Sequence, residues 1–149
     1  MLKIFKENWE IKEINEKDIC KNWKTILYFY PKDNTPWCTT EAKDFTDLKD
    51  EFKKLWYHIV GVSKDSIESH KKFKEKHDLN IDLISDEDLI LHNKFWTYWE
   101  KKAYWKVFMW VIRSTFILDE NCNILNEYRN VKAKNHAERI LKDIQEWKI

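Results

Sequence analysis

Residues 25–41 read TILYFYPKDNTPWCTTE, and the rest of the chain is interpreted around this stretch. Its first six residues are mostly β-branched or aromatic and stop at Pro31, which predicts a buried strand. Thr35 and Pro36 predict a helix start, because Thr is a favoured N-cap and Pro suits the first helical position. Cys38 therefore falls in the first turn of that helix. Unpaired N–H groups and the positive end of the helix dipole favour an anion there, so the stretch predicts a thiolate nucleophile.

Length and composition indicate a soluble globular chain. A length of 149 residues suits one domain with a real core, and a net charge of +1 gives no field that would favour nucleic acid or a membrane. No apolar run reaches membrane-spanning length, and Met1-Leu2-Lys3-Ile4 does not resemble a signal peptide. Three Cys without scaffold spacing favour a reducing compartment, so we expect a cytoplasmic protein.

The hydrophobic pattern along the chain predicts alternating strands and helices. Strands are expected at 24–30, 58–63, 82–86, 111–118 and 124–129, an edge hairpin at 4–14, and helices after Thr35 and at 66–77, 88–95 and 135–146. Residues 18–23 are expected to form a loop, and the Trp-rich residues 96–110 an irregular segment. Strand–helix alternation followed by a strand pair and a helix indicates an α/β fold.

Three motifs carry a family resemblance. Pro31, Thr35 and Cys38 match the signature Pro-x-x-x-Thr-x-x-Cys, within FYPKDNTPWCTTEAKDF, and IVGVSKDS and VIRSTFILDE follow in order. From about residue 5 to residue 144 the chain resembles the peroxiredoxins, specifically the bacterioferritin-comigratory-protein (peroxiredoxin Q) subfamily. The resemblance implies a single thioredoxin-like domain over residues 1–149, with a central mixed β-sheet flanked by helices. Members usually have a further lead-in strand, so we expect the N-terminus to be truncated or mis-started.

The resemblance implies a thiol-dependent peroxidase that reduces hydrogen peroxide and organic hydroperoxides. Cys38 would be the peroxidatic cysteine, oxidised to a sulfenic acid. Thr35 would place its hydroxyl near the thiolate and the peroxide, Pro31 would shield the site, and Arg113 would be the active-site guanidinium. The alternatives are a structural buried cysteine at position 38 and an ordinary ion-paired arginine at position 113. Glu41, one turn after Cys38, is either a polar neighbour of the site or a carboxylate favoured by the helix dipole.

The remaining two cysteines bear on how the enzyme would be recycled. Many members of the subfamily place a resolving cysteine five residues after the first, and here that position is Lys43. Cys20 and Cys122 match no resolving position of the family. We therefore expect a one-Cys cycle with an external reductant (thioredoxin, glutaredoxin or a small thiol), and a disulfide between Cys38 and Cys20 as the second choice.

No metal site and no cofactor are expected. The five His lack the i, i+4 pairing seen in zinc hydrolases, Cys-x-x-Cys is absent, and no Gly-rich phosphate loop is present. His70 and His77, two turns apart on one predicted helix, are interpreted as a solvated flank.

One Gly and nine Trp is an unusual composition. An average chain of this length has roughly ten Gly. Several Trp stand where glycine would suit the predicted turns and helix ends or where the subfamily commonly has glycine: Trp9, Trp23, Trp37, Trp56, Trp96, Trp99, Trp105 and Trp110. Our hypothesis is that a glycine codon, such as a reassigned stop codon, is translated here as Trp. The alternative is nine genuine Trp in a core or an aromatic binding surface.

Two other functions compete with the peroxidase. A thioredoxin-like disulfide oxidoreductase normally needs Cys-x-x-Cys, whereas Thr35-Pro36-Trp37-Cys38 offers one thiol. A non-catalytic binding module would use exposed Trp as an aromatic platform. The expected partners are a hydroperoxide and a thiol reductant, without nucleic acid or membrane, in a monomer or weak dimer.

Overall fold

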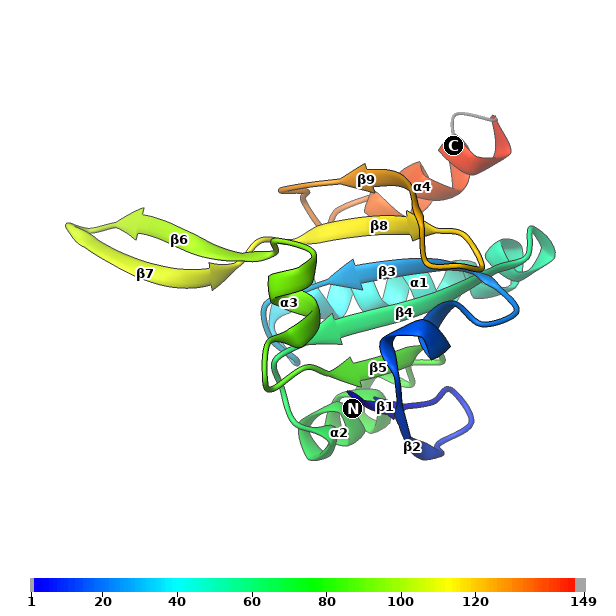
Figure 1. Ribbon diagram of the computed structural model, residues 1–149, viewed down its shortest axis with the longest axis horizontal. Coiled ribbons are helices and arrows are strands. Elements are labelled where there is room, and N and C mark those ends of the chain that lie inside the picture. Colours follow the sequence, from blue (N-terminus) through cyan, green and yellow to red (C-terminus); the bar gives the residue numbers. More distant parts are fainter. Residues whose placement is uncertain (1, 147–149) are drawn as a thin grey trace.

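The computed structural model describes residues 2–146, which form a seven-stranded mixed sheet, a separate two-stranded hairpin and five helices (Figure 1). The strands are β1 (Leu2–Phe5), β2 (Ile11–Ile14), β3 (Lys24–Phe29), β4 (Tyr57–Ser63), β5 (Asp82–Ser85), β6 (Tyr98–Ala103), β7 (Lys106–Val111), β8 (Ser114–Leu118) and β9 (Ile124–Tyr128). The helices are the 3-10 helix η1 (Glu16–Cys20), α1 (Pro36–Lys54), α2 (Ile67–His77), α3 (Ile90–Lys94) and α4 (His136–Gln145). The α/β class and the mixed central sheet predicted from the sequence are confirmed.

The large sheet has the order β2-β1-β5-β4-β3-β8-β9. β3 pairs parallel with β4, and β4 with β5, whereas β1, β2, β8 and β9 pair antiparallel with their neighbours. The loops that follow β3, β4 and β5 therefore meet at one edge of the sheet. Because β8 runs against β3 with Ser114 opposite Phe29, the residue before Ser114 also lies at that edge.

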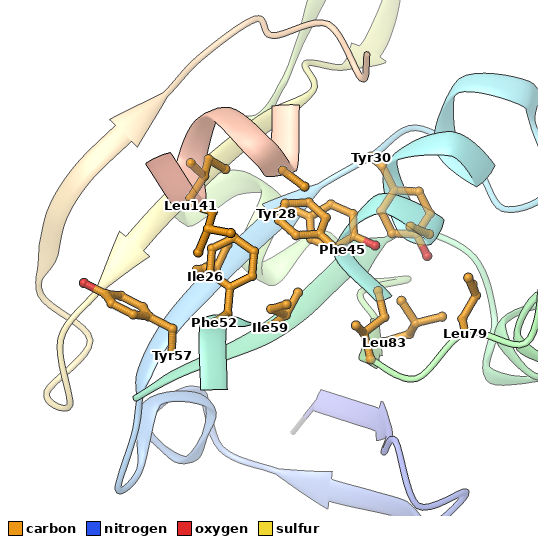
Figure 2. Packing of buried hydrophobic residues seen from close by; sticks show 14 of the residues in the cluster. Ile26, Tyr28, Tyr30, Phe45, Phe52, Tyr57, Ile59, Leu79, Leu83 and Leu141 are labelled. Carbon is orange, nitrogen blue, oxygen red and sulfur yellow. The ribbon is translucent and has the colours of Figure 1, made fainter. Parts of the chain in front are cut away.

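Alternate residues of β3 face opposite sides of the sheet and nucleate two cores. Ile26 and Tyr28 belong to the first core, which residues of α1, α2 and α4 cover. Figure 2 shows part of this core, with Phe45 and Phe52 of α1 against the strand residues. Leu27 and Phe29 face the second core, which contains residues of η1, α3 and β1. The sheet therefore separates two apolar layers, with Cys38 in the first core and Cys20 in the second.

The single glycine is required by packing in the first core. A Cβ at Gly61 in β4 would lie 2.8 Å from Tyr28 Cζ and 2.9 Å from Leu83 Cδ2, closer than side-chain carbons approach. Tyr28 is fully buried and its ring stacks on Phe45. Gly61 thus allows a large aromatic ring to lie directly over the middle of the sheet.

Three expectations about local structure are wrong. Residues 96–110 are not irregular but include most of the β6–β7 hairpin, which projects from the body of the molecule in Figure 1. Residues 106–110 of β7 are exposed on both faces, so no alternation of buried and exposed positions marks the strand. The expected strand 111–118 is interrupted at Ile112 and Arg113, where the chain leaves β6 as partner and joins β3. Residues 18–20 of the expected loop at 18–23 are the end of the 3-10 helix η1.

No helix within residues 2–146 is long and apolar enough to cross a membrane.

Candidate active site

The predicted helix start after β3 is confirmed. Thr35 is the N-cap of α1, with φ −82° and ψ 153°, and Pro36 is the first helical residue. Cys38 is thus the third residue of the helix, with a free thiol and 2% of its surface exposed. It lies in the first core, yet Pro36 and Trp37 just before it are exposed. The sulfur is therefore close beneath the surface, at the positive end of a nineteen-residue helix.

The Thr35 side chain does not cap α1. Its hydroxyl donates to the carbonyl of Lys32 at 2.8 Å, and it makes no side-chain cap hydrogen bond with the helix. The first N–H groups of an α-helix have no partner within the helix. Those at the start of α1, including that of Cys38, are thus not occupied by Thr35. The expected position of the Thr35 hydroxyl near a bound peroxide stays a prediction.

Arg113 lies against the sulfur, although 75 residues separate it from Cys38. Its Nη2 donates to Cys38 Sγ at 3.2 Å. The backbone holds Arg113 in place, because its carbonyl accepts a hydrogen bond from the N–H of Val131 at 2.9 Å. Its position at the end of β7, where the chain crosses to β8, directs the side chain toward α1. The predicted juxtaposition of Cys38 and Arg113 is therefore present.

Glu41 completes a buried ionic group. Arg113 Nη1 donates to Glu41 Oε1 at 2.6 Å, and the Glu41 side chain is fully buried. Burial raises the pKa of Glu41 from 4.5 to about 7, although the Arg113 charge lowers it. Burial lowers the pKa of Arg113, but the charges of Glu41 and Cys38 outweigh this, so that pKa is raised. Arg113 is a fixed cation shared between a thiol and a carboxylate.

The sequence left the role of Glu41 open between two alternatives. Glu41 and Cys38 are three residues apart, which puts both side chains on one face of α1. That spacing was the available signal. It could not show that Arg113, from a distant strand end, reaches both.

Pro31 lies two residues after the end of β3 and is half-buried. Just before it, the Tyr30 N–H donates to the carbonyl of Val62 at 3.0 Å, which extends the pairing of β3 with β4 by one residue. Pro31 thus turns the chain from the sheet toward Thr35. Its shielding of the sulfur stays a prediction.

The pairing of the other two cysteines was not predicted from the sequence. Cys20 and Cys122 form a disulfide, with their Cα atoms 5.5 Å apart. Cys20 lies at the end of η1, before β3, and Cys122 in the turn between β8 and β9. The antiparallel pairing of β3 with β8 brings these two places together. Sequence spacing alone could not show this, because 102 residues separate the two cysteines.

The second-choice pairing of Cys38 with Cys20 is not formed in this structure, because Cys20 is bonded to Cys122. Cys20 belongs to the second core and Cys38 to the first, so the sheet lies between them. They also lie beyond opposite ends of β3, whose six residues span about 20 Å. In this structure Cys38 has no other cysteine within reach.

A model of the AhpC/TSA family matches residues 2–126. The chain belongs to the AhpC/TSA family. The relatives that it matches are named as peroxiredoxins. The sequence is 45% identical over 132 residues to a putative peroxiredoxin bcp of Helicobacter pylori, covering 89% of this chain and 86% of that protein. It is 47% identical over 124 residues to peroxiredoxin Bcp of Bacillus subtilis, covering 81% and 79%.

Solved structures agree with the sequence comparison. A mutant of peroxiredoxin Q from Xanthomonas campestris superposes with a TM-score of 0.87 at 34% identity, covering 98% of this chain and 90% of that one. The resemblance to the bacterioferritin-comigratory-protein subfamily and the thioredoxin-like fold are confirmed. This peroxiredoxin is thus a thiol-dependent peroxidase by family.

A further group of buried polar residues lies outside the Cys38 site of this peroxiredoxin. His70 is not a solvated flank as expected, because it is fully buried with Nδ1 2.7 Å from Asp33 Oδ2. The same Asp33 accepts a hydrogen bond from the Tyr30 hydroxyl at 2.6 Å, so this network fixes the loop between β3 and α1. Within residues 2–146, no three His, Cys, Asp or Glu side chains are placed to share a metal ion.

The Glu41 carboxyl predicts a pH-dependent contribution to the stability of this peroxiredoxin. Its pKa is raised on folding from 4.5 to about 7, so the folded state binds the proton more tightly than the unfolded state. This contribution is fully present below about pH 4.5 and is lost as the pH rises through about 7. We expect the difference in the free energy of unfolding between Glu41→Gln and the parent to shift in favour of the variant by about 3 kcal/mol from about pH 4 to about pH 8. Urea unfolding at the two pH values would measure this difference.

The control for this measurement is Asp50→Asn, which removes an exposed carboxylate from the same helix. It should leave the pH dependence of the parent in place. A difference between Glu41→Gln and the parent that stays constant with pH would show that Glu41 does not titrate in this range.

Proposed function

We propose that Cys38 is the peroxidatic cysteine and that it reduces hydrogen peroxide and organic hydroperoxides. The observation that carries this proposal is the 3.2 Å contact of Arg113 Nη2 with Cys38 Sγ at the first turn of α1. A fixed cation and a helix N-terminus both favour the thiolate, which is the nucleophilic form of cysteine. The free thiol is one of three cysteines, and the other two are bonded to each other.

The reaction would proceed in one displacement. The Cys38 thiolate attacks one peroxide oxygen, an S–O bond forms and the O–O bond breaks. The sulfur loses two electrons and becomes a sulfenic acid, while the leaving hydroxide or alkoxide takes up a proton to give water or an alcohol. Arg113 and the unpaired N–H groups at the start of α1 would stabilise the charge that develops on the departing oxygen. Thr35 would orient the peroxide, and Pro31 would limit access of water.

Organic hydroperoxides are included because of one relative. The structure of a bacterioferritin comigratory protein from Xanthomonas campestris, titled for its alkyl peroxide reduction activity, has a TM-score of 0.86 and 34% identity with this chain. The superposition covers 98% of this chain and 90% of that chain. We extend the alkyl peroxide activity of that protein to this one.

An external thiol would complete the cycle. A thiol of thioredoxin, glutaredoxin or a small molecule attacks the sulfenic sulfur, forms a mixed disulfide and releases water. A second external thiol then breaks the mixed disulfide and restores the Cys38 thiol. The separation of Cys38 from Cys20 and Cys122 by the sheet supports this one-Cys cycle. A cytoplasmic location belongs to the same proposal, and the disulfide is the observation that weighs against it.

A two-Cys cycle is the second candidate, and the Cys20–Cys122 disulfide favours it. In that cycle, reduced Cys20 or Cys122 would attack oxidised Cys38, and exchange would end in the disulfide seen here. The double variant Cys20→Ser/Cys122→Ser distinguishes the two cycles. The one-Cys cycle requires unchanged steady-state turnover with external thiol, whereas a two-Cys cycle requires its loss.

Replacing Cys38 by serine should abolish peroxide consumption. The hydroxyl of serine is not ionised near neutral pH, so no nucleophile remains at the helix start. Peroxide loss would be followed with dithiothreitol as reductant, and the circular dichroism of the variant would show that the fold is kept. Retained turnover would exclude the peroxidase mechanism and would leave the disulfide oxidoreductase and the aromatic binding module as alternatives.

A further inference from the structure

Four tryptophans have a backbone conformation that suits glycine. Trp9, Trp56, Trp96 and Trp105 have φ of 68°, 67°, 58° and 66°. Such left-handed values are costly for a residue with a Cβ, and only Gly, Asn and Asp adopt them routinely. We infer that these four positions are glycine in the natural protein, because its organism reads the corresponding codon as glycine. This inference does not depend on the proposed function.

Two of the four positions end helices. Trp56 follows the last turn of α1 after the C-cap Leu55, and Trp96 follows α3 after the C-cap Phe95. Their N–H groups donate back to the carbonyls of Lys53 and Asn93, at 3.0 and 3.4 Å. A left-handed residue directly after the C-cap is the most common way to end a helix, and it is usually glycine.

The other two positions close hairpins. Trp9 follows a turn in which its N–H donates to the Lys6 carbonyl at 3.0 Å, just before the strand resumes, a place where a left-handed Gly forms a bulge. Tyr104 and Trp105 are the whole two-residue loop of β6–β7, and both have positive φ. Two-residue loops of this kind strongly prefer glycine at the second residue. Each of the four sites therefore has its own structural reason to require glycine.

The distribution of positive φ singles out tryptophan. Twelve non-glycine residues within 2–146 have positive φ, and five of them are Asn or Asp. Four of the remaining seven are Trp, the other three being Leu89, Tyr104 and Cys122. The only glycine of the chain, Gly61, does not have positive φ. Trp has the largest side chain and does not favour tight turns. Its concentration at positions of positive φ therefore indicates that another residue type, glycine, belongs there.

The tryptophan rings at these places are largely exposed. Trp9 contacts the ring of Phe5, and Trp56 and Trp96 contact the rings of two further tryptophans, Trp23 and Trp99. Trp9 is 47% exposed, Trp56 70%, Trp96 64%, and Trp105 fully exposed. The expected glycine count of roughly ten for a chain of this length is met by the one Gly and nine Trp together. Trp23, Trp37, Trp99 and Trp110 do not have positive φ, so for them the composition is the only argument; at the expected Asn22-Trp23 turn the left-handed residue is Asn22.

The codons and the mass of the natural protein test this inference. The gene should carry one reassigned stop codon at positions 9, 56, 96 and 105, and peptides of protein isolated from the source organism should have the mass of glycine there. A standard tryptophan codon at these positions, or peptide masses that contain tryptophan, would overturn the inference.

The recombinant chain offers an independent test of the backbone argument. In urea unfolding, Trp56→Gly should raise the folding equilibrium constant about tenfold over Trp56→Ala, because alanine keeps the left-handed strain and glycine removes it. Trp110→Gly against Trp110→Ala, at a strand position without positive φ, is the matched control and should show no such gain. Equal stability of Trp56→Gly and Trp56→Ala would contradict the requirement for glycine.

Discussion

Replacing Arg113 by alanine should slow the attack of Cys38 on hydrogen peroxide by a factor of about 100 to 1,000. The variant loses the donor that lies 3.2 Å from the sulfur and with it the fixed positive charge of the site. It also leaves Glu41, fully buried, without its ion-pair partner. A rapid-mixing experiment that follows the intrinsic fluorescence of the protein after addition of peroxide would give the second-order rate constant.

A conservative replacement separates the charge of Arg113 from its geometry. Arg113→Lys keeps the charge but not the two-pronged geometry that contacts Cys38 and Glu41 together, so it should recover only part of the rate. An Arg113→Ala variant that reacts as fast as the parent would remove Arg113 from the mechanism.

Removing the Cys20–Cys122 disulfide should lower the free energy of unfolding by about 3–5 kcal/mol. The bond closes a loop with a sequence separation of 102 residues, so it restricts the unfolded chain strongly. For a domain of this size, the melting temperature should fall by roughly 10 °C. Calorimetry of Cys122→Ser would measure both quantities.

Peroxidase activity is the control for the disulfide. The disulfide lies beyond the end of β3 opposite to Cys38, so the rate of peroxide attack should be unchanged in Cys122→Ser at a temperature where it is folded. Treating the parent with a reductant should lower its melting temperature by the same amount. A parent that melts at the same temperature with and without reductant would show that the disulfide does not stabilise the fold.

The fold could be predicted where burial leaves a pattern in the sequence. β3, β4 and α4 have apolar residues at strand or helix spacing, and each was placed within one or two residues. The β6–β7 hairpin left no such pattern, because its second strand is exposed on both faces. The break at Ile112 and Arg113 was missed for a different reason. A change of strand partner alters hydrogen bonding, and apolar residues lie on both sides of the break, at 111–112 and 116–118.

The sequence predicted those parts of the site whose residues are close together in the chain. The helix start with Thr35, Pro36 and Cys38 is a contiguous motif, and capping preferences are sufficient to find it. The meeting of Glu41 with Arg113 and the pairing of Cys20 with Cys122 are products of the register between distant strands. No spacing rule encodes such contacts.

Chemical trapping of the oxidised cysteine tests the central claim most directly. The protein would be treated with stoichiometric hydrogen peroxide in the presence of dimedone, which reacts with sulfenic acids, and its peptides would be mapped by mass spectrometry. We expect the dimedone adduct on Cys38 alone, with Cys20 and Cys122 still bonded to each other. A Cys38 that carries no adduct, or that is recovered in a disulfide with Cys20 or Cys122, would contradict the account.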